Sequence, residues 1–93
     1  MKDKIQINDL LDIYGGLLTR HQQEIMAYYY QEDYSYHEIA QECRISRAAV
    51  SDTVNRATKT LEKYEEAVGY LKKKNQIMDC LEKKEFDKIQ ELL

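Results

Sequence analysis

Side chains that bind phosphates and base edges recur between residues 46 and 59. The set comprises Ser46, Arg47, Ser51, Asp52, Asn55, Arg56 and Lys59. Guanidinium and ammonium groups bond to phosphate oxygens, whereas hydroxyl, amide and carboxylate groups can read the edges of bases. These residue types point to contact with a nucleic acid, so the seven residues form the candidate DNA-binding site.

The expected roles within this site differ. Arg47 and Lys59 are expected at phosphates, and Ser51 and Asn55 at the floor of the major groove, with Arg56 on a guanine or a phosphate. Asp52 also faces the groove floor, although a carboxylate repels phosphate. It is compatible with binding if it accepts a bond from a cytosine amine or pairs with Arg56, four residues further along a helix.

Two helix-start signals position the site. Ser35 followed by Glu38 is a capping box, which predicts a short helix that ends at about Cys43. Arg44 and Ile45 then form a turn, and Ser46 can cap a second helix that begins at Arg47. Two short helices joined by so short a turn predict a helix-turn-helix over residues 35–61, whose second helix can enter the major groove.

An apolar pattern supports this pairing of helices. The small residue Ala40 permits close approach, and the expected cluster consists of Ile39, Ile45, Val50 and Val54, continued by Ala57 and Leu61. An ordinary helical hairpin with a solvated polar face is the alternative. It needs the apolar cluster but not the turn, so the helix-turn-helix is favoured.

The segment resembles the helix-turn-helix of bacterial sigma factor region 4, and LLTRHQQEIMAYYYQEDYS resembles the helix that precedes it there. When the segment SRAAVSDTVNRATKTLEKYE and the charged tail are also considered, the chain most resembles the YlxM-like family. That resemblance implies a DNA-binding regulatory protein. Genes of the family often lie beside those of the signal recognition particle, which implies a role in that pathway. The alternative is an accessory module that binds protein or signal recognition particle RNA without sequence-specific DNA binding.

One residue departs from the pattern of such motifs. Many have glycine in the turn where this chain has Arg44. If the backbone is left-handed at this position, a side chain costs roughly 1 kcal/mol. We therefore expect a less sharp turn.

The rest of the sequence predicts an all-α fold, because no alternating run of β-branched residues suggests a strand. We expect one domain over residues 1–93, a small helical bundle with an extended recognition helix and a helical tail over about residues 62–93. A first helix is expected to start at Asn8 or Asp9, and a capping box of Thr19 and Gln22 starts another. In the tail, one helix is expected around Leu71, Ile77, Met78 and Leu81, and a last one around Phe86, Ile89, Leu92 and Leu93.

A heptad extends the recognition helix beyond the motif. Its positions are Val50, Val54, Ala57, Leu61, Tyr64, Val68 and Leu71, with a mean period of about 3.5 residues. The helix should continue to about Val68 and end at Gly69. The first half of this seam is expected to pack on the motif, and the second on the tail or on another chain. We favour a homodimer through the Val50–Leu71 heptad and the tail, and the alternative is a docking site for another protein helix.

Charge limits the strength of any DNA binding. The net charge is −3, unlike that of a non-specific nucleic-acid binder, but Arg44, Arg47, Arg56 and Lys59 are opposed only by Asp52 between residues 44 and 59. We expect weak or conditional binding that falls with salt. The Lys72–Lys74 triplet is more simply a solvated face.

The consecutive tyrosines Tyr28, Tyr29 and Tyr30 could stack on bases, but at most two of them can share one helix face. Core packing, at least by Tyr29, is the stronger interpretation. Cys43 is expected to be a core residue and Cys80 to be partly exposed.

Enzyme chemistry is not expected. His37 and Glu38 begin like a zinc-peptidase motif, but Gln41 stands where its second histidine would be. No catalytic residue, metal ligand set or cofactor is predicted. No apolar run is long enough to span a membrane, and the first residues do not form a signal peptide, so a cytoplasmic location is expected.

Overall fold

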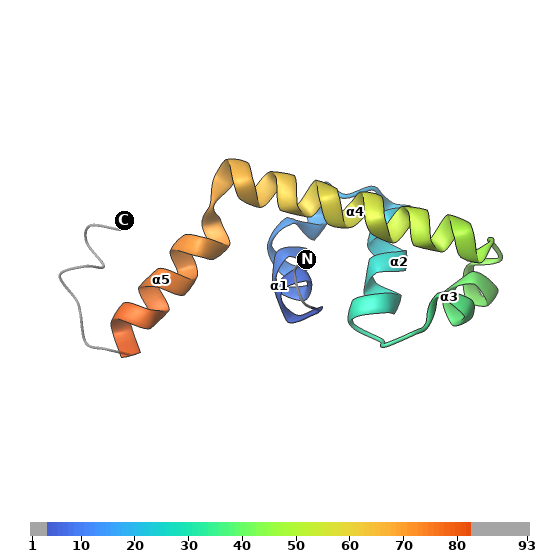
Figure 1. The fold of residues 1–93 in the computed structure, drawn as a ribbon, viewed down its shortest axis with the longest axis horizontal. Coiled ribbons are helices and arrows are strands. Elements are labelled where there is room, and N and C mark those ends of the chain that lie inside the picture. The colour runs from blue at the N-terminus through green and yellow to red at the C-terminus, as the bar shows by residue number, and fades with distance from the viewer. Residues whose placement is uncertain (1–3, 83–93) are drawn as a thin grey trace.

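The computed structural model describes residues 4–82, which form five α-helices and one 3-10 turn (Figure 1). In chain order these are α1 (Lys4–Tyr14), η1 (Gly15–Leu17), α2 (Arg20–Tyr30), α3 (Tyr36–Cys43), α4 (Arg47–Val68) and α5 (Tyr70–Glu82). No strand occurs in this part of the chain, which confirms the all-α prediction. The helix predicted around Phe86, Ile89, Leu92 and Leu93 lies outside the described residues.

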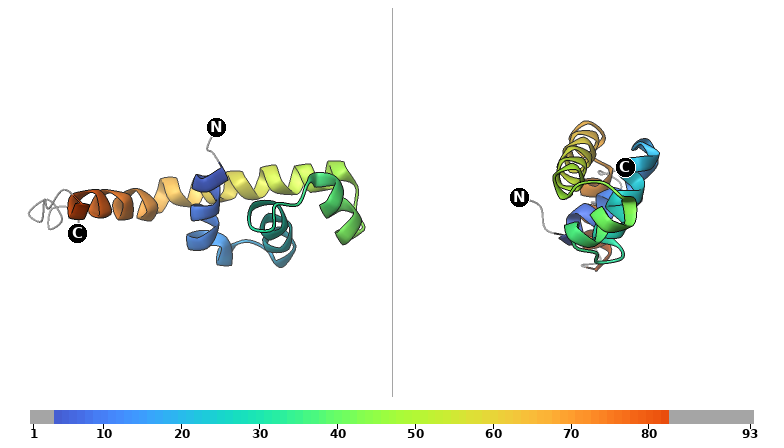
Figure 2. Two further views of the ribbon diagram at one scale, coloured as in Figure 1. Left: turned by 90° about the horizontal axis from the view of Figure 1, so that it is seen from below. Right: turned by 90° about the vertical axis from the view of Figure 1, so that its right-hand side faces the viewer.

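Helix α4 is the element on which the others pack. It contacts α1, α2 and α3, all of which lie on one side of it, whereas α5 extends beyond its far end (Figures 1 and 2). The buried stripe of α4 consists of Val50, Val54, Ala57 and Leu61, each at most 3% exposed. It packs into one core with Ile7, Leu10, Leu11, Tyr14, Leu18, Ile25, Met26, Ile39 and Ala40. Burying a large apolar side chain contributes about 1.5–3 kcal/mol, so this stripe holds the bundle together.

The caps predicted from the sequence are present. Thr19 with Gln22 and Ser35 with Glu38 form complete capping boxes. In the second box the Ser35 backbone N–H donates to the Glu38 carboxylate over 3.0 Å. This bond, with that of the Ser35 hydroxyl, lowers the pKa of Glu38. Because this pKa is lowered, the cap stabilises the fold fully at pH values above the pKa that Glu38 has in the unfolded chain. This contribution is lost as the pH falls through the lower pKa of the folded protein.

The predicted start of the first helix is wrong, because α1 begins at Lys4 and not at Asn8 or Asp9. Ile7 lies three, four and seven residues before Leu10, Leu11 and Tyr14, so all four share one helix face. Burial of Ile7, which is 3% exposed, makes the additional helical turn favourable.

The turn between α3 and α4 is left-handed at Arg44, with φ 57° and ψ 45°. The chain nevertheless closes tightly, since the Arg44 and Ile45 N–H groups both donate to the Ala40 carbonyl. Ile45 then packs against the core. The expectation of a less sharp turn is therefore wrong: contacts on either side of Arg44 hold the strained conformation.

Glu65 joins three elements at the far end of α4. Its carboxylate accepts the Tyr14 hydroxyl over 2.8 Å and the backbone N–H groups of Leu71 and Lys72 over 2.9 and 3.2 Å. The residue before α5 is Gly69, which is left-handed (φ 68°) and has no side chain to cap that helix. Glu65 therefore supplies the cap from α4. Burial, followed by the bond to Glu65, raises the pKa of Tyr14.

The predicted end of the recognition helix is confirmed, because α4 ends at Val68 and Gly69 follows, so the last heptad position, Leu71, lies on α5. The predicted dimer surface needs correction. Val50, Val54, Ala57 and Leu61 are buried by helices of their own chain. Tyr64 stacks on Tyr14, with ring centroids 6.1 Å apart, and Leu71 packs against the core. Of the seven positions only Val68, 64% exposed, is left open for another chain. A homodimer stays a prediction, restricted to Val68 and the tail.

Cys43 and Cys80 are not joined by a disulfide. Cys43 packs against the core, in agreement with its expected role. The expectation for Cys80 is wrong, because that residue is only 6% exposed.

Replacing Arg44 with Gly should stabilise the protein by about 1 kcal/mol, since glycine adopts the left-handed conformation without a steric penalty. Thermal unfolding should show a rise in Tm of a few degrees. Gln41→Gly is the matched control: it lies inside α3 and should lower stability by about 1 kcal/mol. An unchanged or lower Tm for Arg44→Gly would show that the turn carries no strain.

Candidate nucleic-acid interface

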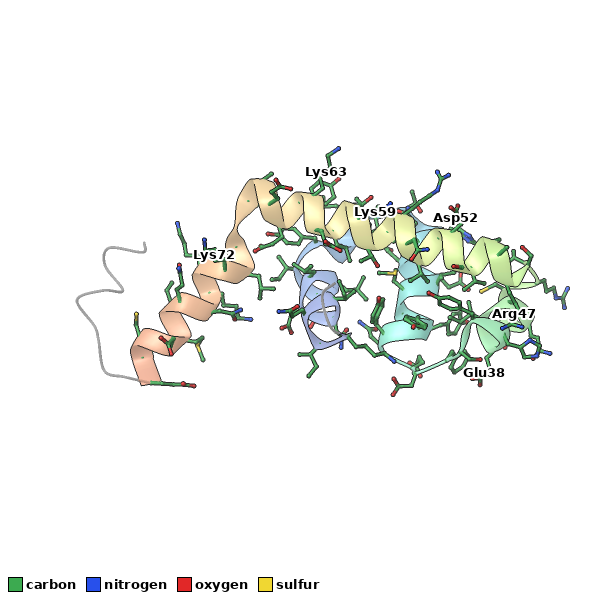
Figure 3. All side chains as sticks on the ribbon, viewed as in Figure 1. Glu38, Arg47, Asp52, Lys59, Lys63 and Lys72 are labelled. Carbon is green, nitrogen blue, oxygen red and sulfur yellow. The ribbon has the colours of Figure 1, made fainter. Side chains whose placement is uncertain are left out.

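The helix-turn-helix predicted over residues 35–61 is present as α3, a three-residue turn and the first part of α4. All seven candidate residues lie at the surface, with Ser51 partly buried and the other six exposed. Figure 3 shows Asp52 and Lys59 on the side of α4 that is turned away from α1–α3, and Arg47 at its start, on the side of α3. The face of α4 that carries Asp52 and Lys59 is free of the other described helices.

The candidate residues divide into two groups around the helix axis. Arg47, Ser51, Asn55 and Lys59 recur every four residues and form one slowly winding stripe. Asp52 and Arg56 lie beyond this stripe. With about 100° of rotation per residue, Arg47 and Arg56 are about half a turn apart, so they point to opposite flanks and cannot reach one site together. Asn55 lies between these flanks.

The side chain of Ser46 has a structural partner. Its Oγ accepts the backbone N–H of Ala49 over 3.0 Å and caps α4, as predicted from the sequence. Because this oxygen is engaged, Ser46 can offer a nucleic acid only its hydroxyl proton. Its contribution is mainly to set where α4 begins.

Asp52 and Arg56 form the ion pair anticipated from their spacing. Arg56 Nε lies 2.9 Å from Asp52 Oδ2, and both side chains are more than half exposed. An exposed pair of this kind is worth at most about 0.5 kcal/mol, so it adds little to stability. Its main effect is electrostatic, because the carboxylate offsets one of the cations on the exposed face.

Sequence reasoning missed two residues on this face. Ala48 is exposed in the first turn of α4 and lies about 20° around the axis from Asn55. A methyl group in that place can contact the methyl group of thymine. Lys63 stands on the same side of α4 as Lys59 (Figure 3). Helical spacing could have identified both, since Ala48, Asp52, Asn55, Lys59 and Lys63 follow one another at intervals of four, three, four and four.

The Lys72–Lys74 triplet belongs to a different surface. It lies on α5, beyond the end of α4, which spans about 33 Å at about 1.5 Å per residue. Its lysines therefore cannot share one DNA contact with Arg47 at the start of α4. This agrees with their interpretation as a solvated face.

The consecutive tyrosines pack against the core and on their neighbours. Tyr28 stacks on Tyr34 with centroids 5.0 Å apart, and Tyr29 contacts Tyr30 and Tyr36. These contacts agree with the core interpretation. Burial raises the pKa of Tyr28, Tyr30 and Tyr36.

Residues 4–82 contain no group of three or more histidine, cysteine or acidic side chains placed to hold a metal ion. None of the helices in this range is both long and apolar enough to cross a membrane.

Comparison with known proteins gives one family. The family described as "Putative helix-turn-helix protein, YlxM / p13 like" (UPF0122) matches residues 1–92. A UPF0122 protein of Listeria welshimeri is 46% identical over 71 residues, which cover 76% of this chain and 64% of that protein. A UPF0122 protein of Desulforamulus reducens is 47% identical over 76 residues, covering 82% of this chain and 65% of the relative. The chain thus spans slightly less than two thirds of these relatives.

Replacing Asp52 with Asn should strengthen binding of duplex DNA about threefold at low salt, because it removes a negative charge beside phosphates and releases Arg56. Fluorescence anisotropy with a labelled duplex measures the change. Asp12→Asn on α1 makes the same change in net charge away from α4 and should leave affinity almost unaltered. Weaker binding by Asp52→Asn would indicate that the carboxylate accepts a bond from a base.

Proposed function

The chain belongs to the UPF0122 family of YlxM/p13-like helix-turn-helix proteins, and from this premise we propose that it binds duplex DNA through α3 and α4 as a regulatory protein. The observation that carries the proposal is the arrangement of α4: two exposed arginines about half a turn apart around the helix axis, with the exposed Asn55 between them.

This arrangement suits the major groove. A helix in the groove presents its central face to base edges and its flanks to the two phosphate walls. Arg47 and Arg56 would then reach phosphates on opposite walls. Asn55 would lie over the bases, where an amide can bond to adenine, and Ala48 would offer a methyl group to thymine.

The charges of the same surface limit the affinity. Arg44, Arg47, Arg56 and Lys59 are all exposed, while Asp52 is paired with Arg56. Each neutralised phosphate contributes about −0.9 to the slope of log affinity against log salt concentration. Three or four contacts would give a slope of roughly −3, which is small beside that of strong DNA binders. Binding should therefore be modest at physiological salt and strong only at low salt.

The link to the signal recognition particle pathway, expected from the family resemblance, stays a prediction. So does the alternative of an RNA- or protein-binding module without sequence-specific DNA binding. The net charge of −3 suits that alternative as well as it suits weak DNA binding. The experiment below includes an RNA arm for this reason.

Replacing Arg47 with Ala should weaken binding to all duplex sequences alike and reduce the magnitude of the salt slope by about one unit, since one phosphate contact is lost. Anisotropy of random duplex DNA and of signal recognition particle RNA, measured across a salt titration, tests this. Lys72→Ala removes one positive charge on α5, beyond the far end of α4, and serves as the matched control, with little change in slope.

Equal slopes for the wild type and Arg47→Ala would show that Arg47 does not contact phosphate. Tight binding of the RNA with no binding of the duplex, even at low salt, would replace DNA by RNA as the partner of this fold.

A further inference from the structure

A small cavity lies beside α4, where α1, the end of α2 and the start of α3 meet it. Its volume is about 130 Å³. Three aromatic side chains and three polar ones surround it, namely Tyr29, Tyr30, Tyr36, Asn55, Thr58 and Glu62, with two aliphatic side chains completing the lining. A cavity of roughly 150 Å³ is large enough for benzene, so this one has room for a ligand of about five heavy atoms.

The three tyrosine rings form one packed cluster at the cavity. The ring of Tyr29 stands at 89° to that of Tyr30 and at 40° to that of Tyr36, with centroids 4.8 and 5.0 Å apart. Enclosing a flat base on both sides would need two parallel ring faces, and the angles at Tyr29 leave no parallel pair among these three rings. A compact cation needs only part of one ring face, within about 6 Å of its centroid.

The polar lining favours the same charge. Glu62 contributes a carboxylate, and no basic side chain occurs among the described residues of the lining. Neither the Lys4–Asp33 nor the Arg56–Asp52 ion pair uses Glu62. An anionic ligand would therefore meet repulsion, whereas a cation would find a carboxylate that those ion pairs leave available.

An acceptor is also available inside the cavity. Thr58 Oγ1 is buried and has no hydrogen-bond partner of ordinary geometry. The Tyr30 hydroxyl is close enough to Thr58 for this neighbour to lower its pKa, although burial raises that pKa by more. A ligand N–H group that donates to this oxygen would supply the acceptor with a well-formed bond.

The protein already holds one ammonium group in the same way. Lys4 Nζ lies 5.1 Å from the centroid of the Tyr29 ring and 2.8 Å from Asp33 Oδ1. An aromatic face and a carboxylate thus share a cation at the edge of this tyrosine cluster. Tyr30, Tyr36 and Glu62 repeat that combination in the cavity.

We propose that this cavity is a binding site for a small organic ammonium ion of about five heavy atoms. The cation lies against the rings of Tyr30 and Tyr36, faces the Glu62 carboxylate and donates an N–H to Thr58 Oγ1. Asn55 closes the site on the side of the candidate DNA-binding face. The proposal concerns the protein alone and does not depend on DNA binding.

The test is a proton NMR titration of the protein with isobutylammonium, beside isobutanol as a neutral ligand of the same size and shape. Ring currents should move the isobutylammonium methyl signals upfield in a saturable manner. Isobutanol should bind at least tenfold more weakly. Glu62→Gln should lower the affinity for isobutylammonium at least tenfold, whereas Glu82→Gln, the same change on α5, should leave it within twofold.

Three results would overturn the proposal. The first is the absence of saturable shifts for isobutylammonium, and the second is equal affinity for isobutanol, which would make the cavity merely apolar. The third is wild-type affinity in Glu62→Gln, which would place the cation elsewhere.

Discussion

The structure depends on the burial of one stripe of α4 by three helices at once. Val50, Val54, Ala57 and Leu61 form the centre of the core. Because the same helix cannot bury its opposite side against those neighbours, that side remains open along the motif (Figure 3). The packing of α4 thus decides which side chains are available to a partner, and the helix-turn-helix is inseparable from the core of the bundle.

Two local devices fix α4 in place. At its start, the left-handed Arg44 and the Ser46 cap set the angle at which it leaves α3. At its end, Glu65 binds both Tyr14 of α1 and the first N–H groups of α5. Strain at Arg44 is tolerated because Ile45 packs against the core and because Ser35 and Ser46 cap the helices on either side. The interface and the tail are therefore both oriented by contacts with the core.

Much of this architecture could be predicted from local sequence. The capping residues Thr19, Ser35 and Ser46 and the end of α4 depend on neighbouring positions, and each was located correctly. Contacts between distant residues could not be found in this way: Tyr14 and Glu65 are 51 positions apart. A heptad shows which residues are buried but not by which chain, so the Val50–Leu71 heptad suggested a dimer seam. For the candidate site, helical spacing identifies the exposed residues and the half-turn between Arg47 and Arg56. Which side of α4 faces the other helices required the structure.

The central claim is that the outer face of α4 binds DNA, and mapping by amide NMR tests it most directly. Isotope-labelled protein is titrated with a short duplex at low salt. The largest shifts should fall in the turn at residues 44–46 and in the first half of α4, with small shifts in α5. Shifts concentrated around Lys72–Lys74, or none at all, would contradict the account.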